Sequence, residues 1–315
     1  MHDPPQSPFS KACLPVGRGG TGGFVVLRTM FEKLIFQSLI GLSFSMYLWL
    51  LAAGLTLVFG VLGVLNFAHG SLFMLGAYAT FTLYGKLGLN FWLSIALSLI
   101  SVGIIGAILE RLFIRRIYDI DLAYQLILTF GFILIFDDLV KIIWGGVAMI
   151  PPMPRFFEGN LSIFGRAFPI YNLFIIAAGF GVAVILWLIL EKTWWGRMIR
   201  ASASDREMAS AIGINIPILF TTVFVLAAML AALGGALGTP VRVVAPGIGT
   251  AMIIQAFVIT VIGGLGNLKG AFVGALIVGI LTAFGILLFP VFELFIIFVV
   301  MAIVLMVKPE GLFGK

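Results

Sequence analysis

The sequence predicts an all-α membrane protein, a polytopic helical bundle of the inner membrane with about eight or nine membrane segments, some of them broken or partial crossings. Hydrophobic residues make up 62% of the 315 positions, charged residues make up 10%, and the mean hydropathy is +1.20. Apolar runs near or above the roughly 18–20 residues that span a bilayer recur along the chain. A β-barrel would instead show alternating strands of about ten residues, and a soluble core does not use so many uninterrupted apolar runs.

The apolar runs define the expected segments. In order, they cover residues 34–60, 66–84, 91–110, 122–144, 170–190, 217–238, 251–263, 268–289 and 291–307. The segment 251–263 is too short for a full crossing, since its thirteen residues span about 20 Å of helix against about 30 Å of hydrocarbon. It ends in GGLGNLKG, which predicts a broken or partial crossing. Non-helical backbone at this depth is tolerated only where protein buries it or a water-filled cavity receives it.

Residues 1–29 differ in composition from the rest, and we expect them to be disordered. They are rich in proline and glycine and have no hydrophobic periodicity, and their GRGGTG motif lacks the preceding strand of a dinucleotide site. A start of translation at Met30 is an alternative hypothesis for this segment. The only cysteine, Cys13, lies in this segment, so no disulfide framework is expected. Residues 30–315 then form one membrane domain.

Lysine and arginine predict the orientation of the segments. With strict alternation, ten of these cations lie on one side of the membrane and five on the other, and the richer side is cytoplasmic. The cytoplasmic set lies in loop 111–121, in loop 191–216, at Lys269 and at the C-terminus. Loop 145–169 and the N-terminus are then outside, although Arg28 and Lys33 argue against that placement of the N-terminus. Because the basic residues lie between membrane segments, the net charge of +6 does not indicate nucleic-acid binding.

A faint internal repeat points to a translocation path. GVLNFAHGSLFMLGAY (63–78) resembles GGLGNLKGAFVGALIV (263–278), since each has a glycine-rich break, an asparagine and then an apolar helix. Paired broken helices indicate the path of a transporter, whereas glycine also recurs in membrane helices for packing alone. Polar residues here alternatively cap helices or form interhelical hydrogen bonds. The candidate path or helix-break residues are Asn66, His69, Gly70, Gln125, Thr129, Gln255, Gly264, Asn267 and Gly270.

The stretch SDREMASAIG (204–213) has the pattern of a short helix from a soluble protein. Ser204 and Glu207 have the spacing of a capping box, and the helix dipole favours Asp205 in the first turn. Gly213 is placed to end the helix. One apolar face is expected, formed by Met208, Ala211 and Ile212, with Ala209 beside it. So short a helix is marginal in water and is stabilised by docking, either on a partner or on its own bundle.

Several stretches carry a family resemblance. EMASAIG (207–213) is similar to the E-A-A-x-x-x-G pattern of the coupling loop in ABC importer permeases, with Met208 in place of the first alanine. Four stretches resemble the branched-chain amino acid ABC permease family: GLTLVFGVLGVLNFAHGSLFMLGAY, TWWGRMIRASASDREMASAIGIN, VIGGLGNLKGAFVGALIVGI and KPEGLFG. The resemblance runs from about Met30 to Lys315. Trp194 and Trp195 depart from it, since a smaller or polar pair is more usual there.

The resemblance implies a pore-forming subunit that works in the lipid bilayer with a second, similar permease, two cytoplasmic ATPases and an extracytoplasmic substrate-binding protein. It implies that residues 204–213 contact the ATPase. The sequence has no G-x-x-x-x-G-K-[ST] phosphate loop, so ATP hydrolysis is expected on the partners, and the chain is expected to be neither an enzyme nor a cofactor or metal binder. On the outer loops, Arg155, Arg166 and Arg242 are candidates for a cationic rim that meets the binding protein, or for anchors at lipid headgroups.

Other functions remain open at this point. Urea and short amides are an alternative substrate class, because related permeases share these motifs. An ion-coupled secondary transporter would need a carboxylate or a sodium site near the membrane centre, whereas the acidic residues here lie near the ends of segments. Among them, Glu110 and Arg111 are expected to form an ion pair at the membrane edge. The repeated breaks argue against a structural subunit that has no path.

Overall fold

The computed structural model describes the backbone of residues 22–163, 166–288 and 290–314, and the chain divides into two compact units, 1–36 and 37–315. Helix α1 runs from Gly22 to Leu62. Residues 22–29 are therefore helical, and the expectation of disorder is wrong for them, because a helix nucleated in an apolar run extends by one hydrogen bond per added residue. Residues 1–21, with Cys13, lie outside the described residues.

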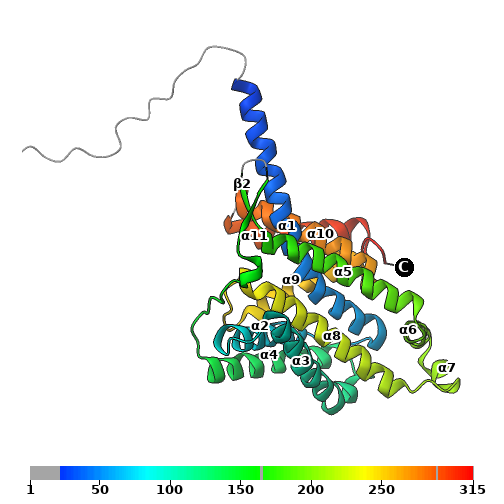
Figure 1. Cartoon of the computed structure of the whole chain (residues 1–315). Helices are drawn as coiled ribbons and strands as arrows, with labels where there is room; N and C mark the ends of the chain where they lie inside the picture. Colours follow the sequence, from blue (N-terminus) through cyan, green and yellow to red (C-terminus); the bar gives the residue numbers. More distant parts are fainter. Residues whose placement is uncertain (1–21, 164–165, 289, 315) are drawn as a thin grey trace, which may run out of the picture. The chain divides into compact units, whose positions relative to one another are not determined.

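Long helices form at the expected segments (Figure 1). After α1 they are α2 (His69–Thr80) with a π-helix at Phe81–Lys86, α3 (Phe91–Leu112), α4 (Leu122–Trp144), α5 (Ile170–Lys192), α8 (Ile216–Gly238), α9 (Ile248–Gly263), α10 (Leu268–Leu288) and α11 (Glu293–Val307). Five stretches in the described part are long and apolar enough to cross a bilayer: Glu32–Leu62, Phe91–Leu112, Ile170–Lys192, Ile216–Val241 and Leu268–Leu288. Helix α9 has 16 residues, so it remains shorter than the hydrocarbon.

Helices α2 and α8 pack together at the centre of unit 37–315, with α3 and α9 against them (Figure 1). Glycine permits this close packing: a Cβ on Gly76 would lie 2.5 Å from the Cα of Ala232, and a Cβ on Gly235 would lie 2.1 Å from the carbonyl oxygen of Phe73. Helix α4 leaves many apolar side chains exposed instead, as a lipid-facing helix does. The sequence therefore encodes a polytopic membrane bundle with a tightly packed centre.

Contacts between loops show which helix breaks and which loops lie at the same end of the bundle formed by residues 37–315. At one end Arg115 donates to the carbonyl of Pro217 (3.1 Å), and the backbone N–H of Leu312 donates to Ile262 (2.8 Å). A Cβ on Gly60 would lie 3.0 Å from the Cα of Gly266, so both helix breaks reach this end. At the other end Tyr84 contacts Met153, Met149 pairs with Val244, and Tyr171 donates to Leu237.

Loop 145–169 contains a small hairpin that the sequence did not predict. Strand β1 (Asn160–Ile163) pairs with strand β2 (Arg166–Pro169) in antiparallel register, so that Leu161 lies opposite Phe168. The turn residues 164–165 lie outside the described residues. Four-residue strands carry too few alternating positions to stand out beside the prolines of this loop.

Candidate functional site

The stretch 204–213 forms a capped helix, although not with the expected cap. Helix α6 (Trp194–Ser204) ends at Ser204, and α7 (Arg206–Ala211) begins two residues later. Asp205 is extended and is the N-cap: its carboxylate accepts a hydrogen bond of 2.9 Å from the N–H of Met208. The expected capping box of Ser204 and Glu207 is therefore wrong, because Ser204 is still inside the preceding helix.

The end of α7 agrees with the sequence. Gly213 has φ +92°, a left-handed conformation that favours glycine. Its N–H donates to Ser210 (3.0 Å), and the N–H of Ile214 donates to Ala209 (3.1 Å), which is the hydrogen-bond pattern of a Schellman motif. The short helix is thus held by hydrogen bonds at both of its ends.

Helix α7 leaves its apolar face uncovered by the described residues. Met208 and Ile212 are 62% and 69% exposed, and Ala211 is also exposed. Only Ala209 is buried against the bundle. The alternative of a loop that packs this face on its own bundle therefore does not apply to Met208 and Ile212.

The first helix break lies between α1 and α2. Gly63 has φ +70°, and helical structure resumes at His69. Asn66 and His69 are buried, and the Oδ1 of Asn66 has no hydrogen-bond partner among the described residues. The position before α2 is Ala68, which makes no side-chain cap. The alternative in which the side chain of Asn66 caps this helix therefore does not apply.

At the second break, between α9 and α10, the side chain of Asn267 caps the start of α10. Gly264 and Gly266 have φ +100° and +82°. The Oδ1 of Asn267 accepts from the N–H of Gly270 (3.1 Å), and its Nδ2 donates to the carbonyl of Phe313 (2.8 Å). Asn267 thus links the start of α10 to the C-terminal segment through its two side-chain hydrogen bonds.

Substitution of the two asparagines should separate these roles. Asn267→Ala removes a cap and a second hydrogen bond, and we expect it to cost about 1–2 kcal/mol of stability. Asn66→Ala should cost less, because its side-chain oxygen makes no bond in the described structure. Thermal unfolding of the two variants in detergent, compared with the unmodified chain, checks the order. Equal losses would contradict the difference between the breaks.

Both breaks include glycines in close contact with the backbone of α9. A Cβ on Gly70 would lie 2.2 Å from the carbonyl oxygen of Gly249 on α9, and a Cβ on Gly270 would lie 2.0 Å from that of Gly263. Distances this short leave no room for any side chain. Helices α2 and α10 therefore both begin in direct backbone contact with α9.

Two of the three remaining polar candidates make local hydrogen bonds. Gln125 donates to the carbonyls of Ile117 (3.1 Å) and Ile120 (3.0 Å), just before its own helix begins. Thr129 donates to Leu126 (3.2 Å), one turn back. Gln255 is buried, and its Oε1 has no partner in the described part. Of these three residues, only Gln255 makes no local side-chain hydrogen bond in the described part of the structure.

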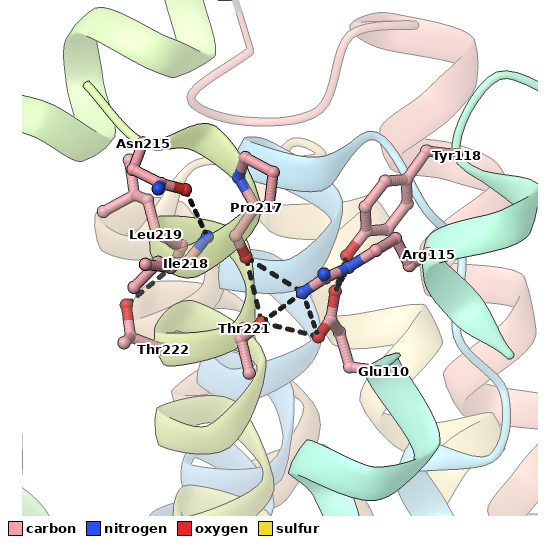
Figure 2. Close-up of polar contacts among 9 residues, drawn as sticks. All are labelled: Glu110, Arg115, Tyr118, Asn215, Pro217, Ile218, Leu219, Thr221 and Thr222. Carbon is pink, nitrogen blue, oxygen red and sulfur yellow. Dashed lines mark hydrogen bonds and ion pairs between the residues drawn. The ribbon is translucent and has the colours of Figure 1, made fainter. Parts of the chain in front are cut away.

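Sequence reasoning missed a polar cluster that joins the end of α3 to the start of α8 (Figure 2). Glu110 is fully buried and accepts two bonds of 3.1 Å from Arg115, one of 2.5 Å from Tyr118 and one of 2.7 Å from Thr221. The expected ion pair with Arg111 is not the one formed, because adjacent residues of a helix do not face each other. Arg115 lies beyond the end of α3, where the chain turns back and brings its guanidinium to Glu110.

The hydrogen bonds of this Glu110 cluster shift the pKa values of its members. The hydrogen bond to Glu110 is the main cause that raises the pKa of Arg115. Burial is the largest cause that raises the pKa of Tyr118, and the hydrogen bond to Glu110 raises it further. Arg115 also bonds the carbonyl of Pro217 in the first turn of α8 (Figure 2). The cluster therefore fixes the position at which the chain enters α8 after α7.

Removal of the buried acid should destabilise the protein strongly. Glu110→Ala removes the carboxylate that Arg115, Tyr118 and Thr221 share as an acceptor, and we expect a loss of about 2–4 kcal/mol. The matched control is Asp138→Ala, which breaks an exposed pair with Lys141 of similar length (2.9 Å) and should cost about 0–1 kcal/mol. Thermal unfolding in detergent measures both, and similar losses would contradict a structural role for the cluster.

The three arginines that the sequence predicts on outer loops differ in their surroundings. Arg155 is exposed, and Arg166 is half-buried on the hairpin. Arg242 instead packs inward: its guanidinium lies over the rings of Phe44 (5.2 Å) and Tyr47 (5.6 Å). Arg155 and Arg166 remain candidates for a cationic rim, whereas the guanidinium of Arg242 packs on aromatic rings of the same chain.

Known proteins match this chain over most of its length. The family described as "Branched-chain amino acid transport system / permease component" matches residues 38–305. The high-affinity branched-chain amino acid permease protein BraD of Pseudomonas aeruginosa is 31% identical over 87% of this chain and 94% of its own length. LivH of Escherichia coli strain K12 is 29% identical over 84% and 91%, and a probable LivH of Methanocaldococcus jannaschii is 29% identical over 92% and 95%. The chain therefore belongs to the branched-chain amino acid transport permease family.

Proposed function

We propose that this permease is the path-forming subunit of an ATP-driven importer of branched-chain or similar amino acids, and that α7 docks on a cytoplasmic ATPase. Family membership and the helical membrane bundle support the general transport role. The role of α7 rests mainly on one observation, the exposed apolar face of Met208, Ala211 and Ile212 on a helix capped at both ends. A preformed helix with an exposed apolar face suits the groove of a partner protein.

The partners follow from the proposed mechanism. The chain has no phosphate loop, so ATP is hydrolysed by two ATPase subunits, and a second, similar permease completes the path. An extracytoplasmic binding protein delivers the substrate. The end of the bundle that holds both helix breaks also holds Arg115, Arg206 and the C-terminal segment. We place this end in the cytoplasm, where the excess of lysine and arginine belongs.

Uptake by proteoliposomes that contain the assembled transporter tests the substrate class. We expect labelled leucine to accumulate inside and unlabelled isoleucine and valine to compete with it. Excess urea or a short amide should not compete. The opposite order of competition would assign the chain to the alternative class, an importer of urea or short amides.

Salt should weaken transport if the outer cations steer the binding protein. Exposed charges mainly raise association rates, and screening shortens to about 8 Å at physiological salt. We expect Arg155→Gln with Arg166→Gln to lower the rate stimulated by the binding protein and to flatten its dependence on ionic strength. Arg242→Gln is the comparison, since its guanidinium packs on rings inside the chain. An unchanged rate and salt profile in the double variant would leave these arginines as lipid anchors.

A further inference from the structure

Arg206 is the residue through which α7 reaches the first helix break. It is the first residue of α7, and its Nη2 donates a hydrogen bond to the carbonyl oxygen of Leu62, the last residue of α1. A Cβ placed on Gly63 would lie 3.3 Å from the same nitrogen. The side chain thus spans from the exposed short helix to the point where α1 ends.

The chemistry of the contact suits both partners. The last carbonyls of a helix have no partner within the helix, and they carry partial negative charge that favours a cation. The guanidinium also lies over the ring of Phe220 on α8, 5.1 Å from its centroid. Its ion pair with Asp119 is longer, at 3.8 Å, and Asp119 is 97% exposed, so this pair contributes little. The bond to Leu62 and the packing on Phe220 therefore hold Arg206.

The second break is held differently. Backbone N–H groups of the C-terminal segment donate to the end of α9, from Leu312 to Ile262 (2.8 Å) and from Phe313 to Gly263 (3.1 Å). Asn267 adds a further bond to Phe313. This break is fixed by a segment that bonds through its backbone, whereas α7 bonds to the first break through one side chain.

We propose that Arg206 is a positioning residue that transmits displacement of α7 to the break between α1 and α2. The proposal rests on the proposed function of α7 as the docking helix. When α7 moves with the ATPase, the bond to Leu62 moves the end of α1 and the segment that leads to His69. Because Gly70 lies in backbone contact with Gly249, that displacement changes the contact between α2 and α9.

The ratio of substrate imported to ATP hydrolysed tests this role. In the reconstituted assembly we expect Arg206→Gln to retain stimulated ATP hydrolysis within about two-fold and to lower uptake per ATP by about five-fold or more. Arg206→Lys keeps the charge and one donor and should restore part of the ratio. Asp119→Asn removes only the long, exposed ion pair and should leave the ratio unchanged.

Each of the following results would overturn the proposal. Hydrolysis and uptake that fall in proportion in Arg206→Gln would show that Arg206 only supports docking or folding. Hydrolysis and uptake that both stay normal in that variant would show that the bond to Leu62 transmits nothing. If Arg206→Gln does not assemble, Arg206→Met takes its place, since methionine also lacks the charge and the donor, and an unchanged ratio of uptake to hydrolysis in Arg206→Met has the same meaning. Failure of the proposed function itself would differ from all of these, since the unmodified assembly would then not couple ATP hydrolysis to uptake.

Discussion

Replacement of Met208 and Ile212 by aspartate is expected to abolish ATP-driven uptake while the protein still inserts and folds. Both side chains are mostly exposed, so their loss removes little packing within the chain. An apolar face that docks in a groove, however, cannot accept two carboxylates without leaving them buried and unpaired, at a cost of several kcal/mol. The measurement is uptake at equal membrane level, together with co-purification of the ATPase.

Ser210→Asp is the matched control for this prediction. Ser210 is exposed on the opposite side of the same short helix, so its substitution tests added charge without touching the apolar face. We expect near-normal uptake for this control. If the Met208 and Ile212 variant transports as well as the Ser210 variant, α7 does not dock through this face.

Gly70→Ala and Gly270→Ala are expected to destabilise the membrane bundle severely. The added Cβ would lie 2.2 Å and 2.0 Å from backbone oxygens, which cannot move without shifting a helix. Overpacking typically costs about 1–3 kcal/mol and more where backbone must shift. We expect a large drop in the unfolding temperature of both variants in detergent, and uptake that falls at least in step.

Gly131→Ala and Gly181→Ala are the matched controls, because an added Cβ meets nothing within 4 Å at either position. Both glycines lie within helices, α4 and α5, where alanine is the better helix former by about 1 kcal/mol. These variants should be as stable as the unmodified chain or more so. Unfolding temperatures that do not differ between the two pairs of variants would contradict the close contacts of α2 and α10 with α9.

The helices could be predicted from sequence because the bilayer imposes their length. A membrane helix satisfies its own backbone hydrogen bonds, so an apolar run of sufficient length specifies it almost alone, and α4 has the bounds expected for it. The hairpin at 160–169 depends on pairing between two very short strands, for which no comparable signal exists. The cap of α7 depended on where α6 ends, and that is decided by tertiary packing.

The two breaks differ through a signal that is present in the sequence. In the aligned repeat, Asn66 stands opposite Gly266, and Asn267 stands opposite Phe67, so the two asparagines are offset by one residue. A capping side chain bonds the N–H three residues on, which only Asn267 reaches at Gly270. The partner of Glu110 depends instead on the path of the chain after α3, which no local pattern specifies.

Uptake of leucine with and without ATP tests the central claim most directly. The chain is reconstituted in proteoliposomes with its second permease and ATPases, with binding protein supplied on the opposite side. We predict accumulation against a gradient only when ATP is present on the side of α7, with no effect of collapsing the proton and sodium gradients. Accumulation that continues without ATP and stops when an ion gradient is collapsed would contradict the account and indicate an ion-coupled transporter.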